Sequence, residues 1–337
     1  MSITKKLLNN STIDFSSKLD TSKFFNEKDV VPTRIPMLNV ACSGSLKGGY
    51  TPGLTMIAGP SKHFKSCFSL ILAKAYLDKY EDAAILFYDS EFGTPQSYFE
   101  KFGIDTDRVV HTPITDVEQL KHDIVVQLKN IERGDRVFIL IDSIGNLASK
   151  KEVEDAEEGK SVADMTRAKQ IKSLFRMVTP HLTIKDIPMV VVNHTYKEIG
   201  LYPKDIVGGG TGSYYSSDNI WIVGRQQEKE GNELAGYSFV INVEKSRYVK
   251  EKSRIPITVM FDGFIEQYSG LFDLALEGGF IKEASKGWYT VGKEESKSRR
   301  ADIEARTELW EGLIVDDAFN EYVKKKYQLA YSGSGDE

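Results

Sequence analysis

The amino-acid sequence predicts an α/β fold with a mostly parallel central sheet flanked by helices. Short, continuously apolar runs alternate with helix-like segments; the runs are 54–58, 83–88, 136–141, 189–193 and 219–223. Runs of this kind are typical of parallel strands that are buried on both faces. A second observation is TMIAGPSKHFKS at 55–66, where an apolar run passes through a glycine turn into a helix. A third is a change of pattern after residue 235, which predicts an antiparallel extension of the sheet.

The chain begins with a predicted N-terminal arm over residues 1–35. Its first 20 residues are polar with scattered leucines, and Phe24 and Phe25 then precede two prolines. This pattern fits either a frayed terminus or an arm that packs on a neighbouring subunit. We expect the second, and assign residues 1–35 to oligomerisation.

Helix-like segments separate the apolar runs of the core, which we predict to extend over 36–270. They are expected at about 65–80, 95–101, 116–132 and 162–184. Asp116 is a plausible N-cap for the third segment, because its short side chain can accept a hydrogen bond from the first helical turn.

The pattern changes beyond the fifth apolar run. The stretches YSFVINVEKSR and IPITVMFDG read as paired strands without a helix between them. A C-terminal region is expected over 271–337, with helices in KEESKSRRADIEARTELW and DDAFNEYVKKKYQLAY. The last residues, SGSGDE, are expected to be disordered because they contain no apolar side chain.

Composition limits the classes of function. The 337 residues are 41% hydrophobic and 28% charged, with a formal net charge of −5, so any nucleic-acid-binding surface must be local. Two cysteines without CxxC spacing fit a reducing compartment. The N-terminus lacks the apolar segment of a secretory signal, and no apolar run approaches the ~18 residues of a membrane span. We expect a cytoplasmic protein.

The stretch at 55–66 has the layout of a phosphate-binding loop. Backbone N–H groups at the start of a helix face an anion, a lysine adds charge, and a Ser hydroxyl reaches Mg²⁺. The predicted phosphate-binding residues are Gly59, Pro60, Ser61, Lys62, His63, Phe64, Lys65, Ser66 and Cys67. The pattern GxxxxGK[ST] has glycine where this chain has Phe64. The alternative is therefore a Gly-Pro turn followed by an ordinary lysine.

Polar residues at three strand ends complete the predicted nucleotide site. Asp142 ends RVFILID, where a P-loop NTPase carries the carboxylate of its Mg²⁺ site. Glu91 follows ILFYDS and is the candidate general base, whereas Asp89 is expected to have a capping or structural role. His194 follows MVVVN and could contact the γ-phosphate, although a lone histidine is more often structural.

Two long polar segments are candidate DNA-binding loops. Residues 194–218 are rich in glycine, tyrosine and lysine, which suits single-stranded nucleic acid but also suits a mobile lid over the nucleotide. Residues 149–163 form a second predicted loop, with an acidic centre that disfavours contact with phosphates. A basic helix follows it, whose charges could equally form a solvated face. The candidate DNA-binding residues are Arg167, Lys172, Lys197, Lys204, Gly209 and Gly210.

Lys245 and Arg247 are two cations that lie one residue apart at the end of a predicted strand. Alternate residues of a strand share a face, so we expect the two side chains on the same face. They could pair with acidic neighbours, or they could reach a phosphate bound to an adjacent subunit.

Several stretches resemble the RecA recombinase family, most closely its T-even phage branch. They include SKFFNEKDVV, LFYDSEFG, NLASKKE, NHTY and VEKSR, and the resemblance extends over roughly residues 20–290. Recombinases of that branch also carry Phe before the Lys of the loop, so Phe64 is compatible with nucleotide binding. The wider family has glycine at this position.

The resemblance implies ATP and Mg²⁺ as ligands and assigns roles to matching positions. Lys65 would bind the triphosphate, Ser66 and Asp142 would hold Mg²⁺, and Glu91 would activate water. Tyr98 would stack on adenine, and His194 stands where relatives have a γ-phosphate-sensing glutamine. Lys245 and Arg247 would act on the ATP of the neighbouring subunit, and the two polar loops would line the filament axis.

The function implied by this resemblance is ATP-dependent homologous recombination. The protein would form a helical filament with copies of itself on single-stranded DNA, pair that strand with a homologous duplex and exchange strands in an infected bacterial host. Contacts with phosphates and base faces should make DNA binding sequence-independent and salt-sensitive. A phage loading mediator and a single-stranded-DNA-binding protein are the implied protein partners. The alternatives are a hexameric replicative helicase on a similar core, and an ATP-bound assembly protein without strand exchange.

Overall fold

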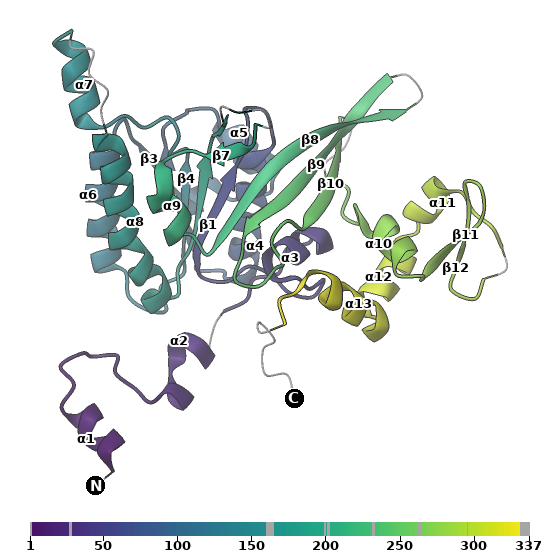
Figure 1. The fold of residues 1–337 in the computed structure, drawn as a ribbon, viewed down its shortest axis with the longest axis horizontal. Helices are drawn as coiled ribbons and strands as arrows, with labels where there is room; N and C mark the ends of the chain where they lie inside the picture. Colours follow the sequence, from purple (N-terminus) through teal and green to yellow (C-terminus); the bar gives the residue numbers. More distant parts are fainter. Residues whose placement is uncertain are drawn as a thin grey trace.

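A central β-sheet organises the computed structural model, which describes residues 2–26, 29–159, 165–198, 200, 203–230, 233–261, 265–294 and 296–330. Eight of the described strands form this sheet, in the order β10-β9-β8-β1-β5-β4-β2-β3 (Figure 1). They are β1 (Gly53–Ala58), β2 (Ala84–Asp89), β3 (Val109–Pro113), β4 (Val137–Asp142), β5 (Pro188–Asn193), β8 (Asn219–Glu230), β9 (Glu233–Lys245) and β10 (Arg254–Met260).

The direction of the strands confirms the predicted fold class. β1 pairs in parallel with β5 and β8, β4 with β5 and β2, and β2 with β3. β9 pairs antiparallel with both β8 and β10, which is the predicted antiparallel extension. All five predicted apolar runs are strands of this sheet.

Helices cover both faces of the sheet, as the continuous apolar runs require. The helices of the core are α3 (Pro36–Ser43), α4 (Lys65–Lys79), α5 (Gln96–Lys101), α6 (Val117–Asn130) and α8 (Thr166–Lys185). Ile57 of β1 faces an apolar cluster with α3 and α4, whereas its neighbour Met56 faces a second cluster with α6 and α8. Adjacent strand residues therefore pack on opposite faces of the sheet. The helices cover these faces, which leaves the carboxyl edge of the parallel strands available for a functional site.

The predicted helices agree closely with the structure. Three of them begin and end within two residues of the expected bounds, and α8 begins at Thr166 rather than at 162, with Met165 as its N-cap residue. Residues 160–164 lie outside the described part of the chain. Asp116 is the N-cap of α6, and its Oδ1 accepts the N–H of Gln119 at 2.8 Å. This confirms its predicted capping role.

Both segments predicted as long loops contain regular structure. The prediction of a loop over 149–163 is wrong for α7 (Lys150–Glu157), which has a capping box between Ser149 and Glu152. The segment at 194–218 holds the hairpin of β6 (Thr195–Lys197) and β7 (Asp205–Val207), followed by α9 (Gly210–Ser216). Part of each segment lies outside the described residues, including Tyr202 of the 194–218 segment.

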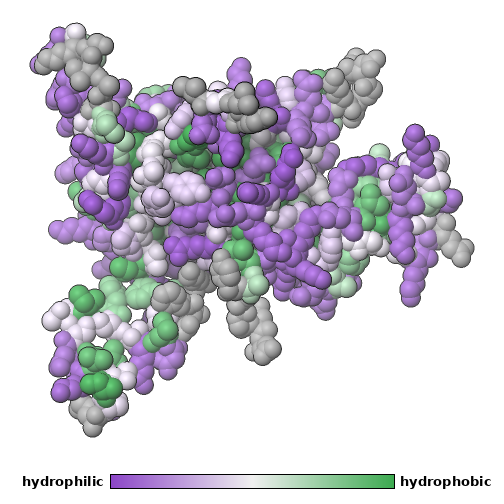
Figure 2. All heavy atoms as spheres, viewed as in Figure 1, coloured by the Kyte–Doolittle hydropathy of each residue, from purple (hydrophilic) through white to green (hydrophobic). Residues whose placement is uncertain are grey.

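The N-terminal arm extends away from the body of the molecule (Figure 1). It contains α1 (Ile3–Asn9), a 3-10 turn at Leu19–Thr21 and α2 (Lys23–Asn26), and the Arg133 guanidinium lies 5.5 Å from the Phe24 ring. Figure 2 shows hydrophobic side chains on the surface of this arm, and its large exposed apolar residues include Ile3, Leu7, Ile13, Phe15 and Leu19. The predicted role of residues 1–35 in oligomerisation stays a prediction.

The C-terminal region shares the apolar cluster of the core on the α4 face. Trp310 and Phe319 are fully buried in that cluster. The region comprises α10 (Leu271–Glu277), the hairpin of β11 (Ile281–Ser285) and β12 (Trp288–Val291), α11 (Arg300–Glu304), α12 (Thr307–Val315) and α13 (Asp317–Tyr327). The predicted disordered end, SGSGDE, lies outside the described residues. Among the residues that are described, no helix is both long and apolar enough to cross a membrane.

Candidate functional site

The predicted phosphate-binding segment spans the turn between β1 and α4 and the first residues of that helix: Gly59, Pro60, Ser61, Lys62, His63 and Phe64 form the turn, and Lys65, Ser66 and Cys67 begin α4. α4 begins at Lys65, so the free N–H groups of its first turn point toward this loop. A Cβ on Gly59 would lie 2.9 Å from the carbonyl oxygen of Val223 in β8. Glycine at this position therefore allows the main chain of the loop to pass close to the main chain of β8, where a larger side chain would clash.

Phe64 occupies the left-handed conformation that the usual loop pattern gives to glycine. Its φ is +62°, at the N-cap of α4. The ring stacks on Phe239 with centroids 4.9 Å apart and meets the edge of Phe68 at 5.3 Å. These aromatic contacts, each about 0.5–1.5 kcal/mol, offset the cost of the left-handed backbone. Phe64 is thus compatible with the helical entry that a phosphate-binding loop requires.

Lys65 lies buried at the base of this loop. Its Nζ donates a hydrogen bond to the carbonyl oxygen of Pro60 at 2.9 Å. Burial lowers the pKa of Lys65, and the nearby carboxylates of Glu91 and Asp142 partly offset this by raising it. The ammonium group is therefore hydrogen-bonded to the loop and lies in the field of two carboxylates at neighbouring strand ends.

Asp142, at the end of β4, is the buried carboxylate of the site. Burial raises the pKa of Asp142 to about 6, against hydrogen bonds from Ser66 and Thr94 that lower it. Thr94 Oγ1 donates to Asp142 Oδ2 at 3.3 Å, while Asp142 Oδ1 has no hydrogen-bond partner within the described part of the chain. A buried, unpartnered carboxylate oxygen beside a serine hydroxyl is a suitable donor set for Mg²⁺, which prefers oxygen ligands.

Glu91 lies just beyond β2 and meets polar residues from two other strands. Its Oε1 is 2.8 Å from Nε2 of His194, which follows β5, and it accepts a hydrogen bond from Ser143 Oγ, which follows β4. The pKa of Glu91 is lowered, chiefly by the hydrogen bond with His194. Because β2, β4 and β5 are parallel neighbours, their carboxyl ends bring these residues together as predicted.

Lys245 and Arg247 lie at the opposite, amino edge of the parallel strands. Lys245 pairs with Ile220 at the start of β8, and its Nζ donates to the carbonyl oxygens of Tyr214 at 2.9 Å and Tyr215 at 3.2 Å. Arg247 forms an ion pair with Asp218 at 2.5 Å, which is the predicted pairing with an acidic neighbour. The structure therefore does not bring these cations to the phosphate-binding loop of the same chain.

Tyr98 lies on the surface of α5. It is 41% exposed, and Lys101 Nζ is 5.9 Å from the centre of its ring. An exposed ring at this position is free to stack on a planar ligand, and its contact with adenine stays a prediction.

The candidate DNA-binding residues do not share one environment. The Arg167 guanidinium is held by three main-chain carbonyls of the segment after β4, at 2.6–3.0 Å, and Lys197 pairs with Asp205 at 2.9 Å. Lys172 and Lys204 are exposed. Gly209 and Gly210 have positive φ values of 88° and 73° and lead into α9.

The sequence did not single out every residue that touches this site. Thr94 and Ser143 contact Asp142 and Glu91, and the adjacency of Ser143 to Asp142 was the available signal. Lys172, Arg176, Tyr215 and Arg247 line a surface cavity of about 520 Å³ between α8, α9 and the end of β9. Three cations therefore line one cavity, Lys172, Arg176 and Arg247, although they lie on separate segments of the sequence.

The phosphate-binding turn and the carboxylates at neighbouring strand ends define a P-loop nucleotide-binding protein. The RecA N-terminal domain matches residues 17–266, and the C-terminal domain of the bacteriophage T4 recombination and repair protein matches residues 268–323. The chain therefore belongs to the RecA recombinase family, on the branch of T4 UvsX.

Similar proteins agree with both matches. The recombination and repair protein of phage T4 is 50% identical over 333 residues, which cover 96% of this chain and 85% of that protein. Protein RecA of Bacteroides thetaiotaomicron is 28% identical over 86% of this chain and 87% of its own length. Protein RecA of Streptomyces rimosus is 27% identical over 80% of this chain and 72% of its own length. None of these findings favours the helicase alternative.

Proposed function

We propose that this protein is an ATP-dependent recombinase that forms a helical filament on single-stranded DNA and exchanges that strand with a homologous duplex. The observation that carries the proposal is 50% identity to the T4 recombination and repair protein over 96% of the chain. The placement of Lys65 at one edge of the sheet and Lys245 at the other supports a filament, because subunits stacked edge to edge would complete each site.

ATP is the nucleotide that the site would take. Lys65 and the first-turn N–H groups of α4 would bind its phosphates, and Ser66 and Asp142 would hold Mg²⁺, which would supply positive charge to the phosphate oxygens. Glu91 would accept the proton of the attacking water. Its lowered pKa keeps it ionised near neutral pH, and His194 and Ser143 fix the position of its carboxylate.

Lys245 and Arg247 would act on the ATP of the neighbouring subunit. Both lie at the amino edge of the sheet, and the side chain of Arg247 is 66% exposed despite its pairing with Asp218. In this arrangement ATP joins two subunits, so ATP binding favours filament assembly and ATP hydrolysis favours dissociation of the subunits.

DNA would bind along the surface formed by α8, α9 and the segment after β5. Lys172, Lys204 and Arg176 are exposed cations of this surface, and Tyr215 is 76% exposed. Such contacts would read phosphates and base faces rather than sequence. The expected setting is the cytoplasm of an infected bacterium, with a phage mediator and a single-stranded-DNA-binding protein as partners.

A strand-invasion assay tests the proposed function. The protein should pair a labelled single strand with a homologous supercoiled duplex in the presence of ATP, and its ATP hydrolysis should rise when single-stranded DNA is added. Lys65→Ala should lose both activities, whereas Lys74→Ala, at a partly exposed position further along the same helix, should keep them. DNA-stimulated hydrolysis by the wild type without any homologous pairing would contradict the proposal.

A further inference from the structure

We propose that Asp89 and His111 are positioning residues that hold Glu91 in place for ATP hydrolysis. Neither residue would touch ATP; they act through the main chain of the turn that carries Glu91. The inference rests on the role proposed above for Glu91.

Asp89 closes the turn that follows β2. It is the last residue of the strand and is 3% exposed. Its Oδ1 accepts the N–H of Glu91 at 3.0 Å and the N–H of Phe92 at 2.8 Å. One buried carboxylate oxygen therefore fixes two consecutive main-chain groups, the first of which belongs to Glu91.

Phe92 makes this turn dependent on Asp89. Its φ is +53°, a conformation that residues with a side chain seldom adopt, and the residue is 62% exposed. Because an exposed ring contributes little packing, the hydrogen bond to Asp89 is the main described contact that stabilises the left-handed backbone here. Without it, the turn is free to relax.

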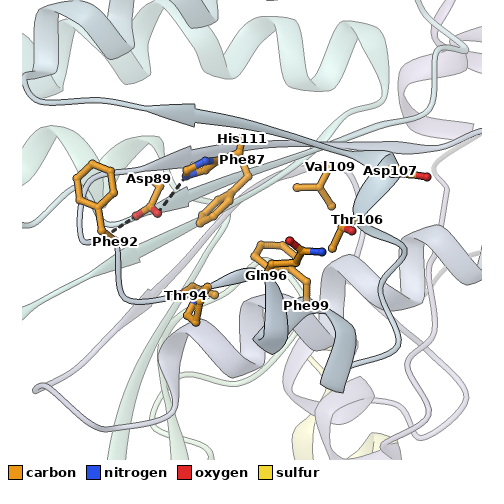
Figure 3. A pocket seen from close by; sticks show the side chains of 11 residues that line it. Phe87, Asp89, Phe92, Thr94, Gln96, Phe99, Thr106, Asp107, Val109 and His111 are labelled. Carbon is orange, nitrogen blue, oxygen red and sulfur yellow. Dashed lines mark hydrogen bonds and ion pairs between the residues drawn. The ribbon is translucent and has the colours of Figure 1, made fainter.

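His111 holds the other oxygen of the same carboxylate. It lies on β3, the edge strand beside β2, and its Nε2 is 3.2 Å from Asp89 Oδ2. The imidazole packs against Phe87 with ring centroids 5.3 Å apart. Figure 3 shows Asp89 between Phe92 and His111, with a dashed line to each. His111 on the edge strand thus orients the Asp89 carboxylate, and this carboxylate fixes the main chain of the turn that carries Glu91.

Glu91 is consequently fixed at both ends. Asp89 holds its main chain, while His194 and Ser143 hold its carboxylate from the other side. A general base must lie within hydrogen-bond distance of the water that it deprotonates. A displacement of about 1 Å can reduce a catalysed rate by about 10²-fold. The pair lines a cavity of about 500 Å³ with Phe99 and Thr106, so the turn has space to move when the contacts are lost.

Variants of Asp89 separate positioning from folding. Asp89→Ala removes the acceptor for both N–H groups, and we expect kcat for DNA-stimulated ATP hydrolysis to fall about 10- to 100-fold. Binding of a fluorescent ATP analogue should change less than about 3-fold, because the phosphate-binding loop is untouched. Asp89→Asn keeps an oxygen for the turn and an amide for His111, and should retain kcat within about 3-fold. His111→Gln keeps a side chain that can hydrogen-bond to Asp89, so its kcat should be higher than that of His111→Ala.

A double-mutant cycle with Glu91→Gln tests whether Asp89 acts through Glu91. If it does, Asp89→Ala should cause less than about a 2-fold further loss of kcat in the Glu91→Gln background. A full multiplicative loss there, or wild-type kcat in Asp89→Ala alone, would overturn the inference. A proportional loss of nucleotide binding in Asp89→Ala would also overturn it. Wild-type turnover by Glu91→Gln alone would instead refute the proposed role of Glu91, so the two failures are distinguishable.

Discussion

The left-handed backbone of Phe64 makes an unusual substitution series informative. Phe64→Ala and Phe64→Gly remove the same aromatic ring, but only glycine accepts a φ of +62° without steric cost. The two variants therefore separate the contribution of the ring from the cost of the backbone conformation. We expect Phe64→Gly to be the more stable of the two.

The magnitudes follow from the contacts of the ring. Phe64 is partly buried, so loss of its burial costs about 1–2 kcal/mol. Loss of its contacts with Phe239 and Phe68 costs about 1–3 kcal/mol more. Phe64→Ala should thus lower the free energy of unfolding by about 2–5 kcal/mol. Phe64→Gly recovers about 1 kcal/mol of this, because the left-handed conformation no longer strains a side chain.

Urea unfolding of the nucleotide-free variants measures this difference. Phe102, whose φ is −81° at the end of α5, is the matched control: there Ala should be at least as stable as Gly. Equal or greater stability of Phe64→Ala over Phe64→Gly would refute the argument that this loop needs a left-handed residue before Lys65.

Three further predictions concern the nucleotide site and the subunit interface. Lys65→Ala should abolish ATP-dependent assembly on single-stranded DNA, and light scattering equal to that of the wild type would contradict its role. Asp142→Asn should stabilise the metal- and nucleotide-free fold at pH 7 by at most about 3 kcal/mol, because the folded protein favours the protonated carboxyl. The gain should fade as the pH falls from about 6 to below 4, so thermal melts with equal gains at pH 4 and pH 7 would exclude this cause. Lys245→Ala should hydrolyse ATP slowly when assembled and recover activity when mixed with a Lys65 variant, and no recovery at any ratio would argue against a shared site.

Much of the fold follows from the sequence because buried parallel strands are continuously apolar. The edge strand β3 escaped prediction because only Val109 and Val110 precede His111, and all of its residues are at least partly exposed. α7 escaped prediction because it has no buried residue and therefore no apolar periodicity. The signal that could have revealed it was its capping box, Ser149 with Glu152. Its stability depends on local hydrogen bonds rather than on an apolar face.

The nucleotide site was predictable for a different reason. Parallel strands end at one edge, so the sequence places Glu91, Asp142 and His194 at the same edge of the sheet, and they meet because β2, β4 and β5 are neighbours there. The contact between Asp89 and His111 depends on β3 lying beside β2, which no periodicity in the sequence specifies. The position of Lys245 likewise depends on β9 running antiparallel to β8, which carries it to the amino edge.

Electron microscopy of the protein with single-stranded DNA tests the central claim most directly. In ATP we expect continuous helical filaments, and with ADP in place of ATP we expect the filaments to be lost, because the proposed phosphate contacts of Lys65 and Lys245 would join neighbouring subunits. Closed rings on the DNA, or filaments that form equally well in ADP, would contradict the account.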